Sequence, residues 1–233
     1  MNPNAMTIKE YENHISLRLL NKAANMELIK ECCHIDCCGI MAAVPYWSES
    51  GKSVLITKEK QRKILRLTDE ELLTIGRKCS LSEGFDITGI YDKLDTMLEG
   101  LPPELIEQLS PDMPDILYVV TNKSECYGAV AIISKQTLDD IAKVIREQHY
   151  FIIPSSVHEV IVIPASAVSD PAGLQEMLIA VNESDVKPEE RLSSDILRYD
   201  GCKLQVCNSL DDLIQQLHIP EKAVTVTRIG VER

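Results

Sequence analysis

Four polar residues in a five-residue run carry the side chains that hydrolytic enzymes use. Ser155 and Ser156 are candidate nucleophiles, His158 is a candidate general base, and Glu159 is a candidate orienting acid. One hypothesis is therefore a hydrolase that uses Ser155 or Ser156 with His158.

The spacing of these residues does not by itself make a catalytic relay. In an extended chain Ser156 and His158 share one face while Glu159 lies on the other, so the acid would have to come from elsewhere. Candidates for that acid are Asp115, Asp139 and Asp140. The sequence also lacks a Gly-x-Ser-x-Gly elbow.

The alternative is a turn after Pro154 in which hydroxyls bond backbone amides and His158 bonds a carboxylate or carbonyl. We expect this turn, with a ligand or partner site there as an intermediate possibility.

A second cluster contains side chains that can bind zinc or iron. Its members are Cys32, Cys33, His34, Asp36, Cys37 and Cys38. On a helix Cys33 would share a face with Cys37, and His34 with Cys38, which makes these four the candidate metal ligands. Structural zinc sites usually combine two separated ligand pairs, and this run does not have that spacing. Because free cysteine usually packs as a small hydrophobe, we expect core positions and no metal.

Other signatures of ligand binding are weak. The glycines at 84, 89 and 100 are too scattered for a nucleotide-binding loop, so we expect no cofactor. One basic cluster precedes Thr68 and is expected on a helix, as a solvated face or a dock for an acidic partner. It consists of Lys58, Lys60, Arg62, Lys63 and Arg66.

Composition indicates an ordinary globular protein. The 233 residues are 45% hydrophobic and 26% charged, and the formal net charge is -12. This charge disfavours broad binding to phosphate backbones, so we expect a protein partner and no direct nucleic-acid binding. No secretory signal and no apolar run of about twenty residues is visible. We therefore expect a cytoplasmic protein without a membrane span, in which the eight cysteines are reduced.

In the first half, periodicity and capping signals predict helices and one strand pair. A helix follows Thr7, with Ile15 and Leu19 on its apolar face, and a second helix covers 23–31. Residues 37–47 and 53–57 are expected as paired strands around a turn at 49–51. Thr68 and Glu71 form a capping box that begins a helix to about residue 79, with Leu67 and Leu72 as a hydrophobic staple. A loop around Gly84 and a helix over 90–98 follow.

In the second half the expected order is β-β-α-β-β-α. Strands are predicted at 115–121, 127–134, 151–154 and 160–164, with helices beginning near Thr137 and Asp170. The tail adds a strand near 203–206, a helix at 210–217 and a strand at 223–229. The fold class is therefore α+β, built mainly from antiparallel strand pairs with packed helices. We expect an N-terminal α+β region over 1–101, a Pro-rich connection over 102–114 and a C-terminal α+β domain over 115–233.

Four stretches carry a resemblance to a known family. They are 21–34 with Asn-Met-Glu-Leu-Ile-Lys, 54–77 with Leu-Thr-Asp-Glu-Glu-Leu, 118–133, and 152–164 with Pro-Ser-Ser-Val-His-Glu-Val. On these residues the chain resembles the bacterial family called domain of unknown function 5688, which is often encoded on mobile elements. The resemblance implies a fold and a context but no activity. It also implies hydrophobic residues at positions 37 and 38.

Three functional hypotheses follow from these patterns. The leading one is a non-enzymatic binding or regulatory module of a bacterial mobile genetic element, with residues 154–159 near its functional surface. The first alternative is the hydrolase described above. The second is an acidic inhibitor whose carboxylates occupy the basic groove of a nucleic-acid-binding defence enzyme.

Overall fold

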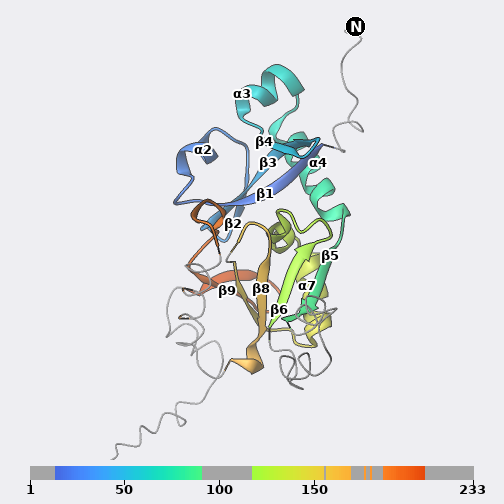
Figure 1. The fold of residues 1–233 in the computed structure, drawn as a ribbon, viewed down its shortest axis with the longest axis vertical. Coiled ribbons are helices and arrows are strands. Elements are labelled where there is room, and N and C mark those ends of the chain that lie inside the picture. Colours follow the sequence, from blue (N-terminus) through green and yellow to red (C-terminus); the bar gives the residue numbers. More distant parts are fainter. Residues whose placement is uncertain are drawn as a thin grey trace, which may run out of the picture.

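Two antiparallel sheets follow each other along the long axis of the molecule (Figure 1). The computed structural model describes residues 14–90, 117–154, 156–168, 176, 179 and 186–207. Its strands and helices confirm the α+β class.

The first sheet is built around a central strand, β3 (Met41–Glu49). Strand β1 (Ile15–Asn21) pairs with one edge of β3, while β2 (Ile35–Cys37) and β4 (Lys52–Leu55) pair with different parts of the other edge. Helix α2 (Met26–Lys30) covers one face through Ile29, and α4 (Asp69–Ser82) covers the other through Leu72 and Ile75.

A two-residue turn joins β3 to β4. Ser50 and Gly51 have φ values of 51° and 77°, and two successive positive values are typical of the type I′ turn that fits a twisted hairpin. The predicted strand pair is confirmed. Beyond it, α3 (Lys58–Lys60) and a π-helical segment, η1 (Gln61–Leu65), lead to α4.

The second sheet has six strands in the order β10-β9-β7-β8-β6-β5. Their bounds are β5 (Phe85–Gly89), β6 (Tyr118–Asn122), β7 (Tyr150–Ile153), β8 (Val160–Pro164), β9 (Ile196–Tyr199) and β10 (Leu204–Cys207). A short 3-10 segment, η2 (Gly128–Ile133), and α7 (Lys135–Ile145) pack against one face. Two further 3-10 turns are η3 (Ala165–Ala167) and η4 (Pro188–Glu190).

The two sheets share one core. Leu17 and Leu19 of β1 belong to the same buried cluster as Val130 of η2 and Ile141 of α7. Strand β5, which precedes the predicted Pro-rich connection, pairs with β6, which follows it. The connection itself, 102–114, lies outside the described residues, so the division into two domains remains a prediction.

Several local predictions are confirmed. Thr68 Oγ1 accepts from the Glu71 amide at 3.2 Å and the Thr68 amide donates to Glu71 Oε2 at 2.8 Å, which is the predicted capping box. Leu67 packs in the cluster that contains Leu72. The strands expected at 151–154 and 160–164 are β7 and β8, which pair antiparallel, and the tail strand is β10.

Two element types were predicted wrongly. Ile15 and Leu19 lie on a strand, because residues four apart share a face in both a helix and a strand. The strand expected at 127–134 is the 3-10 segment η2, because Tyr127 adopts a left-handed conformation with φ 57° and the Asn122 side chain bonds both backbone groups of Cys126. The first strand pair of the expected β-β-α-β-β-α order is therefore absent.

Strands β1, β2, β5 and β9 were not predicted as strands. Residues 196 and 197 are both buried, so β9 shows no alternation of polar and apolar positions. The helices expected at 90–98, 170–181 and 210–217, and the strand at 223–229, fall almost entirely outside the described residues.

A substitution at Gly128 tests how much the close contact between η2 and the second sheet contributes to stability. A Cβ there would lie 2.5 Å from the Asn122 amide nitrogen, 2.6 Å from the His158 carbonyl oxygen and against Thr121 Oγ1. We expect Gly128→Ala to lower the free energy of unfolding by about 1–3 kcal/mol, because backbone atoms must shift. Urea denaturation measures this loss. Gly76→Ala is the control, since its nearest neighbour is the flexible end of Leu17, and an equal loss in both variants would contradict the explanation.

Candidate functional site

The Ser156 side chain, a candidate nucleophile of the hydrolase alternative, is bonded to its own turn. Ser156 Oγ accepts from the His158 amide at 2.9 Å, and Ser156 forms an isolated antiparallel bridge with Arg191. Ser155 lies outside the described residues, as does Asp115. Glu159 follows His158 at the entry to β8. The Ser156 hydroxyl is therefore directed at the backbone of its own turn.

Both nitrogens of the His158 ring face other groups. Nδ1 accepts from the Tyr127 amide at 3.4 Å, and Nε2 lies 3.7 Å from Glu190 Oε1. Since Nδ1 is an acceptor in this arrangement, the proton of the neutral ring lies on Nε2, toward Glu190. The ring also stacks on Tyr127 with centroids 5.5 Å apart. The geometry positions His158 as a support for Tyr127 and not as a base for Ser156.

Tyr127 connects the two sheets. Its hydroxyl lies 3.3 Å from Arg18 Nη1 on β1 and 3.1 Å from Ser53 Oγ on β4. The Tyr46 ring of β3 meets it edge-on at 5.0 Å. The turn at 154–159 thus holds a tyrosine that contacts three strands of the first sheet.

The candidate metal ligands are divided between different parts of the fold, although Cys37 and Cys38 contact each other. Cys33 packs with Ile15 and Leu72, whereas Cys37 packs in the core shared by the two sheets. Burial raises the pKa of the Cys33 thiol to about 11, and the contact with Cys38 together with burial raises that of Cys37. His34 Nδ1 faces the Cys32 carbonyl, and Cys38 Sγ donates to the Leu204 carbonyl at 3.5 Å. Among the described residues, no group of three His, Cys, Asp or Glu side chains could hold a metal ion.

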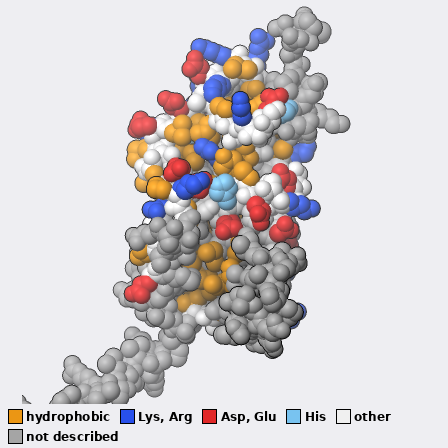
Figure 2. All heavy atoms as spheres, viewed as in Figure 1, with side chains coloured by type: hydrophobic (Ala, Val, Ile, Leu, Met, Phe, Trp, Pro, Cys, Tyr) orange, Lys and Arg blue, Asp and Glu red, His pale blue; other side chains and the backbone are white. Residues whose placement is uncertain are grey.

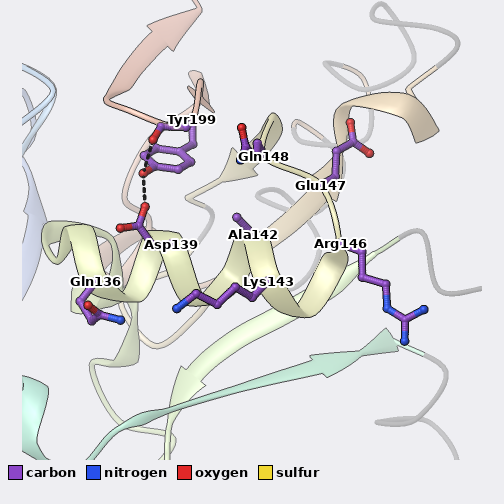
Figure 3. A pocket seen from close by; sticks show the side chains of 9 residues that line it. Gln136, Asp139, Ala142, Lys143, Arg146, Glu147, Gln148 and Tyr199 are labelled. Atoms are coloured by element: carbon purple, nitrogen blue, oxygen red, sulfur yellow. Dashed lines mark hydrogen bonds between the residues drawn. The ribbon is translucent and has the colours of Figure 1, made fainter.

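An open cavity of about 450 Å³ lies between α7 and the end of β9 (Figure 3). Tyr199 donates to Asp139 Oδ1 at 2.6 Å and accepts from Lys135 Nζ at 3.2 Å. Burial and the Asp139 carboxylate raise the pKa of Tyr199, while the bonds from Lys135 and Tyr199 lower the pKa of Asp139. Figure 3 shows Arg146 extending away from this group. The protonated Tyr199 hydroxyl can donate to Asp139. Its bonds with Asp139 and Lys135 hold α7 against β9, and we call them the Asp139 clamp.

A cleft of about 370 Å³ separates the first sheet and α4 from the loop after β6. Two of its serine hydroxyl groups bond to residues of other chain segments. Ser80 Oγ accepts from the Leu17 amide at 2.7 Å, and Ser124 Oγ donates to Glu83 at 3.2 Å. Burial raises the pKa of Tyr46 at this cleft to about 12. These contacts join elements and do not assemble a nucleophile with a base.

An apolar groove of about 210 Å³ lies on the first sheet beside η1. It is lined by Trp47, Val54, Leu55, Ile56, Lys60, Ile64 and Leu65. Ile64 is 69% exposed and Val54 is 50% exposed, although both lie beside the buried Ile56. The groove is thus a surface extension of the core that α4 covers.

The groove depends on the segment between β4 and α4. Gln61, which is 2% exposed, donates to the Leu67 carbonyl and to Asp69 Oδ1, so it attaches η1 to the start of α4. The π-helical turn closes with the Arg66 amide on the Gln61 carbonyl at 2.7 Å. These bonds hold Ile64 and Leu65 next to the β3-β4 hairpin.

Six of the seven residues that line the groove belong to a basic segment, residues 52–66. Six Lys or Arg residues and one Glu give this segment a formal charge of +5, which leaves -17 for the rest of a chain whose total is -12. Lys60, Arg62 and Arg66 are exposed, and none of them makes an ion pair with another described residue. At the end of the molecule that carries α3, Figure 2 shows hydrophobic side chains with Lys and Arg side chains beside them.

The sequence identified the basic cluster but not the groove. Ile64 and Leu65 stand among basic residues, which is a visible signal, yet Trp47 and Val54 come from two other elements, β3 and β4. The pairing of β3 with β4 places Trp47 beside Val54, and η1, which Gln61 attaches to the start of α4, adds Ile64 and Leu65 to the groove.

Comparison with known proteins identifies one family. A family model described as "Family of unknown function (DUF5688)" matches residues 2–201. No curated protein and no solved structure matches the chain. None of the helices in the described part of the chain is both long enough and apolar enough to span a membrane.

The Ser156 hydroxyl provides a direct test of the hydrolase hypothesis. We expect a serine-reactive fluorophosphonate to leave the protein unlabelled, because Ser156 bonds the backbone and His158 is directed at Tyr127 and Glu190. Ser156→Ala should lower the free energy of unfolding by about 0.5–1.5 kcal/mol through the lost turn bond. Labelling of the wild type that disappears in Ser156→Ala would instead identify a nucleophile.

The Asp139 clamp predicts a stability difference that depends on pH. Because the pKa of Asp139 is lowered in the fold, its carboxylate stabilises the protein above its ordinary pKa of about 3.9, and this contribution is lost as the pH falls through the lower folded value. We expect Asp139→Asn to be less stable than the wild type at pH 7 and the two to converge in acid. Thermal unfolding from pH 7 to about pH 2 measures this. A difference that does not change with pH would exclude a role for the charge.

Proposed function

We propose that this chain, which belongs to the DUF5688 family of unknown function, is a non-enzymatic module that binds an acidic segment of a partner protein. The observation that carries the proposal is an apolar groove lined mostly by a segment of charge +5, on a chain that is otherwise strongly acidic. A bacterial mobile genetic element as the setting belongs to the same proposal and rests on the resemblance.

The apolar part of the site supplies contact area. Val54 and Ile64 are exposed, and a fully buried aliphatic side chain gains about 1.5–3 kcal/mol relative to an exposed one. Trp47, which stacks on His14 with centroids 4.6 Å apart, offers a rigid aromatic surface beside them. Aromatic residues at the centre of a patch often dominate binding energy. A partner side chain in this groove would be largely removed from water.

The basic side chains around the groove select the partner's charge. Lys60, Arg62 and Arg66 are exposed and can approach carboxylates without breaking an ion pair to a described residue. Rim charges of this kind mainly accelerate association and exclude partners of like charge. An acidic protein segment is therefore favoured over a basic one.

The same charge distribution argues against nucleic acid. Binding to a phosphate backbone requires a basic surface along several phosphates, whereas the chain beyond the basic segment carries a formal charge of -17. The inhibitor hypothesis requires a concentrated acidic surface. The concentrated charge beside the groove is basic, which favours docking of an acidic partner.

Selection from a displayed peptide library tests the proposed function. We expect enriched peptides to combine acidic with apolar residues and to bind with an affinity that falls as salt is added. Fluorescence polarisation should show at least tenfold weaker binding to Val54→Asp and Ile64→Asp, because a carboxylate would enter the groove.

Val144→Asp is the matched control. Val144 lies on α7 and is 48% exposed, close to the 50% of Val54, so the same substitution is made at equal exposure away from the groove. This variant should bind like the wild type. If no peptides are enriched, or if the Val54 and Ile64 variants bind them with unchanged affinity, the groove is not the binding site. Thermal unfolding verifies that each variant is folded.

A further inference from the structure

We infer that the partner segment binds in an extended conformation, as a strand added to the outer edge of β4. This inference rests on the proposed function and specifies how the groove is occupied. It follows from the hydrogen-bond pattern of the β3-β4 hairpin, from an edge of β4 that no other described strand pairs with, and from the small size of the groove.

The turn fixes which backbone groups of β4 point outward. In a hairpin with a two-residue loop, the residues that flank the loop exchange both backbone hydrogen bonds, and such pairs then alternate along the strands. Glu49 pairs with Lys52 and Trp47 pairs with Val54, so the backbone groups of Lys52 and Val54 face β3. Those of Ser53 and Leu55 therefore face the opposite side.

Two backbone bonds support this alternation. The Ser48 amide donates to the His14 carbonyl at 2.8 Å, which places the backbone groups of Ser48 on the β1 side of β3. The Ile56 amide donates to the Pro45 carbonyl at 3.0 Å, as expected for a residue in phase with Lys52 and Val54. Ser53 and Leu55 are out of phase with these residues.

The outer edge of β4 is open in the described part of the chain. Strand β4 pairs only with β3 there, and no described backbone group bonds the amide or carbonyl of Ser53 or Leu55. An added strand could use these four groups, two donors and two acceptors, for the main-chain ladder that characterises strand addition.

Successive side chains of β4 lie on opposite faces of the strand, so one face contacts Tyr127 and the other face contributes to the groove. Ser53 points toward Tyr127, to which its hydroxyl is bonded, whereas Val54 lies on the opposite face with Trp47 in the groove. Alternate side chains of an added strand would continue the row of Trp47 and Val54. The intervening side chains would lie on the other face of the added strand, so carboxylates there would be attracted by the net positive charge of the 52–66 segment and would not enter the groove.

A strand fits this site better than a helix. An amphipathic helix needs apolar contacts over several turns, at positions i, i+3, i+4 and i+7. The groove of about 210 Å³ is smaller than ordinary ligand pockets of about 300–1,000 Å³ and has room for one or two side chains. The main-chain bonds of an added strand would supply the remaining affinity.

A second copy of the chain is disfavoured as the occupant. Pairing of β4 with β4 of another copy would bring two segments of charge +5 together. An acidic strand from a different protein meets the opposite charge. The inference therefore commits to an acidic, extended segment of a partner protein.

Two peptides of identical composition test the inference. One has ten residues that alternate Glu with Val, and the other has the same residues with Val at the spacing of one helix face. We expect the alternating peptide to bind the intact protein at least tenfold more tightly. On its binding, amide hydrogen exchange followed by NMR should slow at Ser53 and Leu55 and stay unchanged at Lys52 and Val54, which already bond β3.

The outcomes separate this inference from the proposed function. If the helical isomer binds equally well or better and Ile64→Asp weakens it, the groove binds acidic segments but strand addition is wrong. The same conclusion holds if the alternating peptide binds without slowing exchange at Ser53 and Leu55. If neither peptide binds, both proposals fail. Binding of the alternating peptide should also be lost when the amide nitrogens of alternate residues are methylated in one phase, and kept in the other.

Discussion

The contact between Gly128 and the second sheet is the constraint on which the arrangement of the two sheets depends. At this point the backbone lies against the end of β6 and the carbonyl of His158, so closely that no side chain fits. The preceding residue, Tyr127, adopts a left-handed conformation with φ 57°. The tyrosine then reaches the first sheet, where its hydroxyl meets Arg18 and Ser53.

This connection gives the polar turn at 154–159 a structural role. Thr121 Oγ1 donates to the His158 carbonyl at 2.9 Å, and the His158 ring stacks on the Tyr127 ring. The side chains that suggested catalysis thus form a junction. Ser156 and His158 are half-buried there, and their hydroxyl and Nδ1 atoms accept hydrogen bonds from backbone amides.

The junction also bears on the proposed binding edge. Ser53 is held by Tyr127 on one face of β4, Val54 is exposed on the other face, and no described residue pairs with the outer backbone groups. Natural proteins usually protect such edges with short strands and charged residues, because an open edge attracts other strands. Strand β4 is four residues long and begins with Lys52. Its protection is incomplete at Val54, where an apolar side chain is presented to solvent next to Ile64.

The sequence alone determined the features that depend on local chemistry. The Thr68 capping box and the β3-β4 hairpin were predicted because neighbouring residues satisfy each other's backbone groups. Periodicity was ambiguous where spacing fits two structures, as for Ile15 and Leu19. It was misleading before η2, where the left-handed Tyr127 and the bonds between Asn122 and Cys126 turn the chain out of the extended conformation. The basic cluster could be identified from the sequence, but the adjacent groove could not, since Trp47 and Val54 meet Ile64 only in the tertiary structure. Likewise, the residue types at 154–159 suggested catalysis. The direction of the His158 ring is decided by its contacts with Tyr127 and Glu190, and these residues come from distant parts of the chain.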